Sequence, residues 1–428
     1  NIMELKAGQS VALTIGDKAT VVKELGRGGQ GIVYLVKVGG KDMALKWYIN
    51  PPDDKFYRNL EKNVNAGAPS EAFIWPEYLT RRENGSYGYV MRLRPQDYFE
   101  FGNFLLARKR FKSFNAMLAA AMKISSGFKM LHRHGYSYQD LNDGNFFINP
   151  DSGDVLICDN DNVMPQGEKS GIMGKARYMA PEVVAGNAPD KYSDRFSLSV
   201  ILFMLFFNNH PFEGSKVVAC PCMTEKYEKA FYGSEAVFIY DPDIKTNLPV
   251  RGVHNNVIKR WPLFPQKLKD VFVREFSQEL LKTPNMRMIE DGWERLISQV
   301  RDELVNCPVC KDETFVIDSE VSTCKCMNCG KEFDISKRFK MGNRQVILTL
   351  GTDIYVDRDN IPDATIIPSP KGDNELWIRN ISPVKWAVET ASGKLKAVEP
   401  NGIMPIKEGM KISFGLDNIK AEIITNQK

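Results

Sequence analysis

The sequence has few histidines, almost no net charge and no long apolar run. Four of its 428 residues are histidine, which we interpret as structural, and the formal net charge of +4 is too small to indicate binding to nucleic acid or a membrane. The longest apolar run, residues 198–207, is about half as long as a membrane-spanning helix and is a candidate for a buried core helix. No signal-peptide pattern opens the sequence. We therefore expect a cytoplasmic protein.

Cysteine is sparse over most of the chain but concentrated in one segment. Five of the eight cysteines lie between Cys307 and Cys329, which favours metal ligation in a reducing compartment over a disulfide framework. Two C-x-x-C pairs, Cys307 with Cys310 and Cys326 with Cys329, have the spacing of a closed structural zinc site. Cys324 is left over and replaces Cys326 if the second pair is shifted. A redox C-x-x-C is the weaker interpretation, because no βαβ pattern surrounds it.

The pattern of apolar residues divides the chain into four parts. Residues to about 93 are rich in strands, apart from a helical stretch at 54–65. A helical part follows to residue 302, then a cysteine module at 303–336 and an all-β sandwich at 340–428, so we predict an α+β protein. Strands are expected at 11–15, 21–25, 32–38 and 43–48, helices at 115–133, 192–207, 266–281 and 292–304, and further strands at 346–350, 354–356, 375–379, 386–389, 394–398 and 411–414.

A glycine-rich segment lies between two of the first predicted strands. It reads G-x-G-x-x-G-x-V from Gly26 to Val33, and glycines let backbone N–H groups approach phosphate oxygens. A dinucleotide-binding motif would instead precede a helix. Lys46 follows on the next strand. A hairpin turn and a solvent-facing lysine would explain either feature alone, but their order favours phosphate binding.

Three polar side chains have the spacing used to transfer a phosphoryl group from ATP. Asp140 and Asn145 lie on one loop in the sequence Asp-Leu-Asn-Asp-Gly-Asn, and Asp159 directly follows an apolar strand. Side chains of this kind hold Mg²⁺ and orient an attacking hydroxyl. A polar turn would explain one of these motifs but not both in this order. Asp161 competes with Asp159 for the metal-binding role.

Together these motifs resemble the eukaryotic-type (Hanks-type) serine/threonine protein kinases of bacteria, over roughly residues 17–300. The resemblance implies a bilobal kinase fold at 1–302, with a β-rich N-lobe to about residue 93 and a helical C-lobe. It implies Asp140 as the carboxylate that accepts or orients the hydroxyl proton, and Lys46 as the ammonium that binds the phosphates. Asn145 and Asp159 would bind Mg²⁺ or Mn²⁺.

The same resemblance implies how ATP and Lys46 are held. A glutamate on the helix after Lys46 should pair with it, and Glu61 is the candidate, with Glu71 as the alternative. The nucleotide site is expected to comprise Gly26, Gly28, Gly29, Gly31, Val33, Ala44, Lys46, Met91 and Leu93.

Downstream residues resemble the part of a kinase that holds a protein substrate. Ala180-Pro181-Glu182 matches the end of the activation segment, where the glutamate pairs with a buried arginine, here Arg287. Asp194 matches the aspartate that binds the backbone of the catalytic loop. Because small-molecule kinases lack this Ala-Pro-Glu platform, the acceptor is expected to be a protein hydroxyl of the serine/threonine class.

Four departures from the family pattern bear on activity. Gln139 replaces an arginine that reads a loop phosphate, and Asn142 replaces a lysine near the γ-phosphate. Asn160-Asp161 stands in place of Phe-Gly, and Lys175 in place of a threonine. We expect a kinase that transfers the γ-phosphoryl group of ATP to serine or threonine, including its own. The alternatives are a pseudokinase scaffold that binds nucleotide and a small-molecule kinase.

The C-terminal segment loosely resembles forkhead-associated (FHA) domains. The likeness rests on Leu-Trp-Ile-Arg-Asn-Ile-Ser at residues 376–382 and on a glycine-containing strand pair at 406–415. The phosphothreonine-reading residues of that family are missing, since no histidine follows His254. The whole arrangement resembles bacterial kinases associated with phosphatase and von Willebrand-type partner proteins. The expected partners are those proteins and a protein substrate, with no nucleic acid and no membrane.

Overall fold

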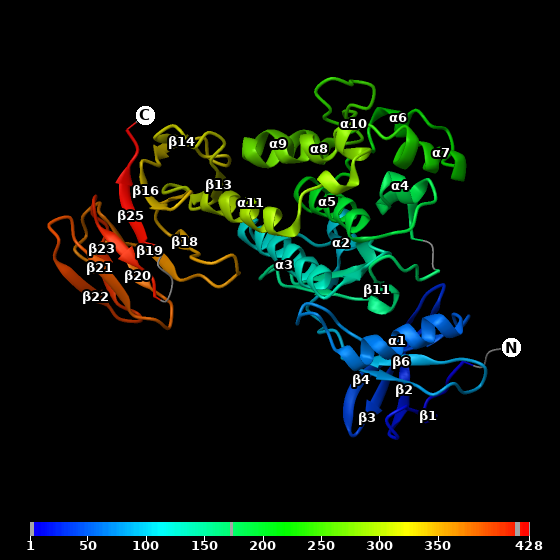
Figure 1. The fold of residues 1–428 in the computed structure, drawn as a ribbon. Coiled ribbons are helices and arrows are strands. Elements are labelled where there is room, and N and C mark those ends of the chain that lie inside the picture. The colour runs from blue at the N-terminus through cyan, green and yellow to red at the C-terminus, as the bar shows by residue number, and fades with distance from the viewer. Residues whose placement is uncertain (1–3, 172–173, 416–419, 428) are drawn as a thin grey trace.

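Two lobes and two smaller modules follow one another along the chain (Figure 1). The computed structural model describes residues 4–171, 174–415 and 420–427. A β-rich N-lobe precedes a helical C-lobe, and the cysteine module and a β-sandwich lie at the end of the C-lobe that is remote from the N-lobe (Figure 1). The predicted β-rich N-lobe, helical C-lobe, cysteine module and β-rich C-terminal segment are present in the predicted order.

The N-lobe is an antiparallel sheet in the order β1-β2-β3-β4-β6-β5, with helix α1 packed beside it. Gly39 and Gly40 both have positive φ (54° and 80°), which is what a two-residue hairpin between β3 and β4 requires. The predicted strand at 11–15 is shorter, because the chain turns at Gly16. The elements are β1 (Ser10–Ala12), β2 (Lys18–Arg27), β3 (Gly31–Val38), β4 (Lys41–Tyr48), α1 (Asp54–Ala66), β5 (Tyr78–Leu79) and β6 (Gly88–Met91).

The C-lobe is built around helix α5 (Lys191–Phe207), which is the predicted buried apolar run. Asp190 caps its start by accepting from the backbone N–H groups of Tyr192 and Ser193, and Asn208 ends it in a left-handed conformation. Almost every residue of α5 from Phe196 onward is buried. The other helices are α2 (Phe101–Leu105), α3 (Phe114–Arg133), α4 (Pro181–Val184), α6 (Ser215–Val218), α7 (Glu225–Lys229), α8 (Asn255–Arg260), α9 (Gln266–Glu275), α10 (Gln278–Leu281) and α11 (Glu290–Asp302).

Short strands position the loops between these helices. They are β7 (Phe99–Glu100), β8 (Tyr136–Ser137), β9 (Phe146–Ile148), β10 (Val155–Ile157) and β11 (Met164–Pro165). The predicted helix at 266–281 is in fact two helices, because Ser277 leaves the helical conformation and its hydroxyl caps α10 at Leu280. Within the described ranges, no helix combines the length and the apolarity needed to cross a membrane.

The cysteine module consists of two hairpins, and the C-terminal segment is a sandwich of two sheets. The hairpins are β12 (Leu304–Asn306) with β13 (Glu313–Phe315) and β14 (Thr323–Lys325) with β15 (Glu332–Asp334). One sheet of the sandwich has the order β17-β16-β25-β24-β21-β22 and the other β18-β19-β20-β23. A single core that includes Phe339, Ile378 and Trp386 fills the space between them.

Four strands of the sandwich were not predicted from the sequence. These are β16 (Lys337–Met341), β19 (Ala364–Pro368), β23 (Ile403–Pro405) and β25 (Lys420–Thr425), and two of them end on a proline. The predicted strands correspond to β17 (Arg344–Ile347), β18 (Asp353–Ile354), β20 (Leu376–Asn380), β21 (Trp386–Glu389), β22 (Leu395–Val398) and β24 (Lys411–Ser413). The all-β sandwich itself is confirmed.

Specific contacts fix both C-terminal modules to the C-lobe. The carboxylate of Glu313 on β13 accepts from the backbone N–H groups of Phe114 (2.7 Å) and Asn115 (3.0 Å), the first residues of α3. Arg344 on β17 forms a bidentate pair with Asp302 at the end of α11 (both 2.9 Å). The cysteine module thus caps a helix of the C-lobe, and the sandwich is held by a charge-assisted contact.

Candidate active site and metal centre

The glycine-rich turn joins β2 to β3. The backbone N–H of Gly28 donates to the carbonyl of Gly31 (2.9 Å). Gly31 lies so close to β4 that a Cβ there would stand 2.5 Å from the carbonyl oxygen of Trp47. Gly26, Gly28 and Gly29 have no atom within 4 Å of where a Cβ would stand. The turn therefore keeps its backbone open, as a phosphate-binding loop requires.

The predicted apolar residues of the nucleotide site come together beside this turn. Ala44 on β4 lies opposite Met91 on β6, and Val33 and Leu93 pack on the same cluster. Phe147 joins them from β9 in the C-lobe, a residue that the sequence motifs did not single out. An apolar wall formed by both lobes is the kind of surface that holds a flat aromatic base.

Lys46 is buried on β4 and pairs with two aspartates. Its Nζ lies 2.9 Å from Oδ2 of Asp161 and 3.6 Å from Oδ1 of Asp159. The hydroxyl of Tyr48 donates to the same oxygen of Asp161 (2.6 Å). Burial by itself would lower the pKa of Lys46, but the two carboxylates outweigh it and raise that pKa. The lysine is therefore a charged ammonium held by the loop after β10.

The predicted glutamate partner of this lysine is corrected by the structure. Glu61 lies on the exposed face of α1, and the alternative, Glu71, is exposed as well. The face of α1 that meets the site carries Asn59 and Asn63, one helical turn apart, so Glu61 points to the opposite side. Both asparagines donate to the backbone carbonyl of Val163 (2.8 and 2.9 Å). Helix α1 thus contacts the loop after β10 through neutral amides.

Asp159 and Asp161 have different surroundings although they are two residues apart. Asp159 has a left-handed backbone (φ 57°), and its side chain is 52% exposed, whereas that of Asp161 is completely buried. Asn160 between them donates to the carbonyl of Ile74 (2.8 Å), which fixes the loop. Packed neighbouring atoms and the charge of Asp161 raise the pKa of Asp159, in part offset by Lys46. Asp159 is open to a ligand, while Asp161 is committed to the lysine.

Helix α5 supports the catalytic loop from behind. The carboxylate of Asp194 accepts from the backbone N–H groups of Tyr138 (2.7 Å) and Gln139 (3.1 Å), so the predicted contact is present. The Tyr138 hydroxyl donates to the carbonyl of Cys158 (2.6 Å), and Nδ2 of Asn145 donates to the same carbonyl (3.2 Å). The catalytic loop is therefore joined to the segment that carries the two aspartates.

Asp140 lies on this loop among amide donors. Nδ2 of Asn162 is 3.4 Å from its Oδ2, and Nδ2 of Asn142 is 3.5 Å from its Oδ1. Burial and, to a smaller extent, the negative charge of Asp161 raise the pKa of Asp140. A raised pKa makes a carboxylate a better proton acceptor. Asn162 directly follows Asp161. The loop that pairs with Lys46 through Asp161 therefore also contacts the carboxylate of Asp140 through Asn162.

Two buried ionic networks brace the C-lobe. The guanidinium of Arg287 binds Glu182 through both nitrogens (2.7 and 2.9 Å), as the family resemblance predicts. His132 on α3 lies between Asp194 on α5 and Glu290 on α11, with Nε2 at 2.8 Å from Asp194 and Nδ1 bonded to Glu290. Burial opposes the charged form of His132, but the two carboxylates raise its pKa to about 9. His132 is therefore structural, as expected.

The sequence profile of the protein kinase domain matches residues 19–236, just over half of the chain. The chain belongs to the protein kinase family. Protein kinase C delta type from Mus musculus is 28% identical over 208 residues, 46% of this chain and 30% of that protein. Protein kinase YegI from Escherichia coli is 24% identical over 233 residues, 50% of this chain and 36% of that protein.

Another bacterial relative extends this set. The probable serine/threonine-protein kinase PknB from Lactococcus lactis is 28% identical over 221 residues, 47% of this chain and 34% of that protein. This kinase thus spans about a third of the length of the curated relatives it matches. The solved kinase domain of Mycobacterium tuberculosis PknI, a double mutant, aligns over 69% of this chain and 100% of its own, with 19% identity and a TM-score of 0.46.

A glutamine in the catalytic loop of this kinase binds the segment that follows β11. Nε2 of Gln139 donates to the hydroxyl of Ser137 (3.0 Å) and to the carbonyl of Glu168 (2.5 Å). Its Oε1 accepts from the backbone N–H of Ser170 (3.0 Å). A neutral amide thereby connects the catalytic loop to residues 168–170, where the family arginine would read a phosphate.

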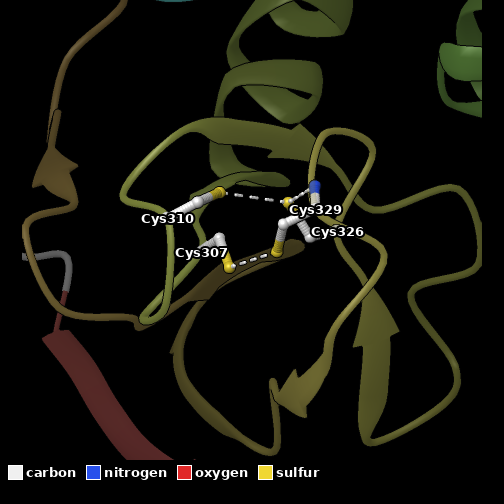
Figure 2. A group of neighbouring side chains, drawn as sticks. All are labelled: Cys307, Cys310, Cys326 and Cys329. Carbon is white, nitrogen blue, oxygen red and sulfur yellow. Dashed lines mark hydrogen bonds between the residues drawn. The ribbon is translucent and has the colours of Figure 1, made fainter.

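Four cysteines of the kinase form a compact group in the cysteine module (Figure 2). The sulfurs of Cys307, Cys310, Cys326 and Cys329 all lie within 4.8 Å of one another. Sγ of Cys307 is 3.7 Å from that of Cys329, and Sγ of Cys310 is 3.6 Å from that of Cys326. These separations fit the edge of a tetrahedron with zinc–sulfur bonds of about 2.3 Å. Cys324 on β14 lies outside this group.

The backbone around these cysteines has the form of two matching turns. Lys311 and Gly330, each one residue after the second cysteine of a pair, have left-handed backbones (φ 67° and 73°). Backbone N–H groups point at the sulfurs: that of Val309 donates to Cys307 (3.4 Å) and that of Asn328 to Cys326 (3.3 Å). N–H groups directed at sulfur stabilise thiolates, so the donor set and its surroundings fit a thiolate-bound metal ion.

Proposed function

We propose that this kinase transfers the γ-phosphoryl group of ATP to serine or threonine hydroxyls of a protein substrate, including its own chain. In this reaction the hydroxyl oxygen forms a bond to phosphorus, the bond from phosphorus to the bridging oxygen of ADP breaks, and the hydroxyl proton passes to a base. Asp140 is the base, since its carboxylate has a raised pKa.

Other side chains of the site hold the nucleotide. Lys46 binds the phosphates as a charged ammonium, and Asp161 with Tyr48 keeps it in place. Asn145 and the half-exposed Asp159 would hold Mg²⁺, which when bound offsets the negative charge of the phosphates. The glycine-rich turn would cover the phosphates with backbone N–H groups.

One observation carries this proposal: the lysine, the base and the metal ligands are linked through one short loop. Asp159 and Asp161 pair with Lys46, and Asn162 approaches Asp140. Asn145 is joined to the residue that precedes this loop. A site for phosphoryl transfer needs these groups within reach of one triphosphate.

Transfer of radiolabel from γ-labelled ATP tests the proposal. The full chain should label itself or a generic serine-containing protein, and Asp140→Asn should lose at least a hundredfold in rate while still binding nucleotide. Because Asn keeps the size of the side chain, nucleotide binding serves as the control for folding. Equal labelling by both proteins would exclude Asp140 as the base.

A nucleotide-binding scaffold is the second candidate. Asn142 stands where the family has a cation near the γ-phosphate, and it is buried against Asp140, which removes one charge from the transition state. If ATP binds while neither protein transfers label under any divalent metal, the scaffold is the function. ATP turnover stimulated by a metabolite and not by protein would indicate a small-molecule kinase instead.

We further propose that the four-cysteine group binds structural zinc. With four thiolates filling the coordination shell, the ion would stabilise the module and take no part in phosphoryl transfer. Elemental analysis of the full chain should find one zinc per chain, and Cys307→Ser combined with Cys310→Ser should remove it. Cys324→Ser should retain the zinc. Loss of zinc from Cys324→Ser would show that Cys324 is one of the zinc ligands.

The β-sandwich is proposed as a docking module for other proteins. Its likeness to FHA domains stays a prediction, because the kinase profile ends at residue 236. Asn380 has the internal role expected of a strand-end asparagine, since it donates to the carbonyls of Val384 (2.7 Å) and Val398 (3.2 Å). Partners of the phosphatase and von Willebrand type are proposed from the sequence resemblance alone.

A further inference from the structure

A groove runs along the junction of the C-lobe and the cysteine module. It encloses a cavity of about 580 Å³. The C-lobe contributes α2, the turn at residues 107–112 and the start of α3, and the cysteine module contributes Asp312, Met327 and Asn328 from its two metal-site turns. The groove therefore exists only when the cysteine module is folded against the kinase.

A second cavity lies between this groove and the catalytic loop. It has a volume of about 340 Å³ and is lined by Asp143 of the catalytic loop and Arg177, which precedes Ala-Pro-Glu. Leu105, Met204 and Asn208 line both cavities. The two cavities are therefore neighbours, one beside the catalytic loop and the other beside the cysteine module. We call the two cavities together the ribbon trench.

The ribbon trench carries cations that lack acidic partners. Lys109, Arg110, Lys112 and Arg260 line it, and none forms an ion pair among the described residues. Arg260 donates to the carbonyl of Phe206 (3.2 Å), and its pKa is lowered by burial and by the like charge of Arg110. Two guanidinium groups that line one cavity without a carboxylate partner favour a ligand that brings negative charge.

The acids at the edge of the ribbon trench are already engaged. Asp312 accepts from Nδ2 of Asn328 (2.5 Å), and Glu313 caps the start of α3 through two backbone N–H groups. These hydrogen bonds leave the negative charges of Asp312 and Glu313 in place, so the first cavity has four cations and two acids and keeps an excess of positive charge. Asp143 and Glu213 line the second cavity, where Glu213 pairs with Arg177.

Apolar side chains make up a large part of the remaining wall. The rings of Phe104 and Phe111 lie 4.8 Å apart, and Met117, Met204 and Met327 line the same cavity. Methionine side chains are flexible and adapt to ligands of different shape. A ligand that fits this wall combines carboxylates with a large apolar side chain.

We propose that the ribbon trench is a docking site for the protein substrate, and that it selects a segment in which acidic residues flank a large apolar residue. This inference rests on the proposed kinase function, because the position of the trench beside Asp143 of the catalytic loop is what assigns the occupant. A segment bound there would raise the local concentration of the acceptor hydroxyl at the catalytic loop. The cysteine module would then take part in substrate choice.

Binding can be tested without phosphoryl transfer. The probe is a short fluorescein-labelled peptide that alternates Glu and Asp with Phe and Leu, measured by anisotropy with the full-length Asp140→Asn variant. Adding Arg110→Glu should weaken binding roughly tenfold, whereas Arg58→Glu, the same substitution on an exposed residue of α1, should leave it unchanged. A peptide with Lys and Arg in place of the acids should not bind.

Phosphoryl transfer provides the second part of the test. With Asp140 intact, a serine peptide fused to the acidic segment should show a KM raised roughly tenfold by Arg110→Glu, with kcat unchanged. The same serine peptide without the segment should react equally with both proteins. If no transfer occurs at all, the proposed kinase function fails while the anisotropy still reports on docking. Equal peptide binding by Arg110→Glu and Arg58→Glu, or equal competition by a single-stranded oligonucleotide, would overturn the docking proposal.

Discussion

The two lobes of this kinase differ in how their buried charged side chains are held. In the C-lobe, ion pairs link separate elements: Arg287, in the segment before α11, reaches Glu182 on α4, and His132 on α3 joins Asp194 to Glu290. In the N-lobe, the ion pairs that the buried lysine makes within the described part of the chain are with two acids of one loop, and helix α1 contributes two amides to that loop. Ionic contacts between separate elements thus form the framework of the C-lobe. The position of Lys46, in contrast, does not depend on a charged side chain of α1.

The strongest test of the C-lobe framework is removal of the arginine that binds the Ala-Pro-Glu glutamate. Arg287→Met leaves the carboxylate of Glu182 without its cation and should lower the free energy of unfolding by about 3–5 kcal/mol. Arg295→Met is the matched control, because Arg295 makes an exposed pair with Asp291 that is worth less than about 1 kcal/mol. Urea denaturation followed by fluorescence would measure both. Equal urea midpoints for Arg287→Met and Arg295→Met would contradict the conclusion that buried ion pairs hold the C-lobe together.

The buried histidine gives the C-lobe a defined pH dependence. Its pKa is about 9 in the folded protein and close to 6.5 when unfolded, so the folded state binds the extra proton more tightly. The resulting stabilisation, on the order of 3 kcal/mol, is fully present below pH 6.5 and is lost as the pH rises through 9. Thermal melting of wild type and His132→Gln should therefore differ most at low pH and converge above pH 9.

An exposed histidine supplies the comparison for that experiment. His134→Gln changes the same residue type on the exposed end of α3, and its melting curve should follow that of wild type at every pH. A difference between wild type and His132→Gln that does not change with pH would mean that packing, and not proton binding, stabilises this network.

In the N-lobe, replacing the buried aspartate should reduce activity more than replacing the exposed glutamate. Asp161→Asn removes the charge that keeps Lys46 protonated and oriented, so kcat/KM for ATP should fall about fiftyfold, equivalent to about 2.3 kcal/mol. Glu61→Gln should retain the wild-type value, because Glu61 does not face the site. The opposite ranking would show that α1 rotates and brings Glu61 to Lys46 in the working enzyme.

The contacts of Lys46 also show which features of the site can be predicted from a sequence. Lys46, Asp140 and Asp159 lie in motifs with fixed spacing, so the chain order alone places them in one site. The partner of Lys46 has no such fixed spacing, because it depends on which face α1 turns inward. Asn59 and Asn63 at one-turn spacing were the available signal, since they mark a polar inward face.

In the C-terminal half, too, features with a fixed local spacing could be predicted, whereas contacts between distant residues could not. The two C-x-x-C pairs predict the four-cysteine group, because short turns fix the sulfur positions. The docking of Glu313 on α3 could not be predicted, because it joins residues far apart in the chain that share no local pattern. Strands β19 and β23 were missed because each ends on a proline, which weakens the strand signal although it is tolerated at a strand end.

The smallest expected effect concerns the contact between the catalytic loop and residues 168–170. Gln139→Ala removes the amide that binds Ser137, Glu168 and Ser170, at a cost of about 1–2 kcal/mol, and kcat should fall roughly tenfold. Ser170→Ala retains the backbone N–H that Gln139 accepts, so its kcat should stay within about twofold of wild type. If Ser170→Ala loses as much activity as Gln139→Ala, the Ser170 hydroxyl is as important for this segment as the amide of Gln139.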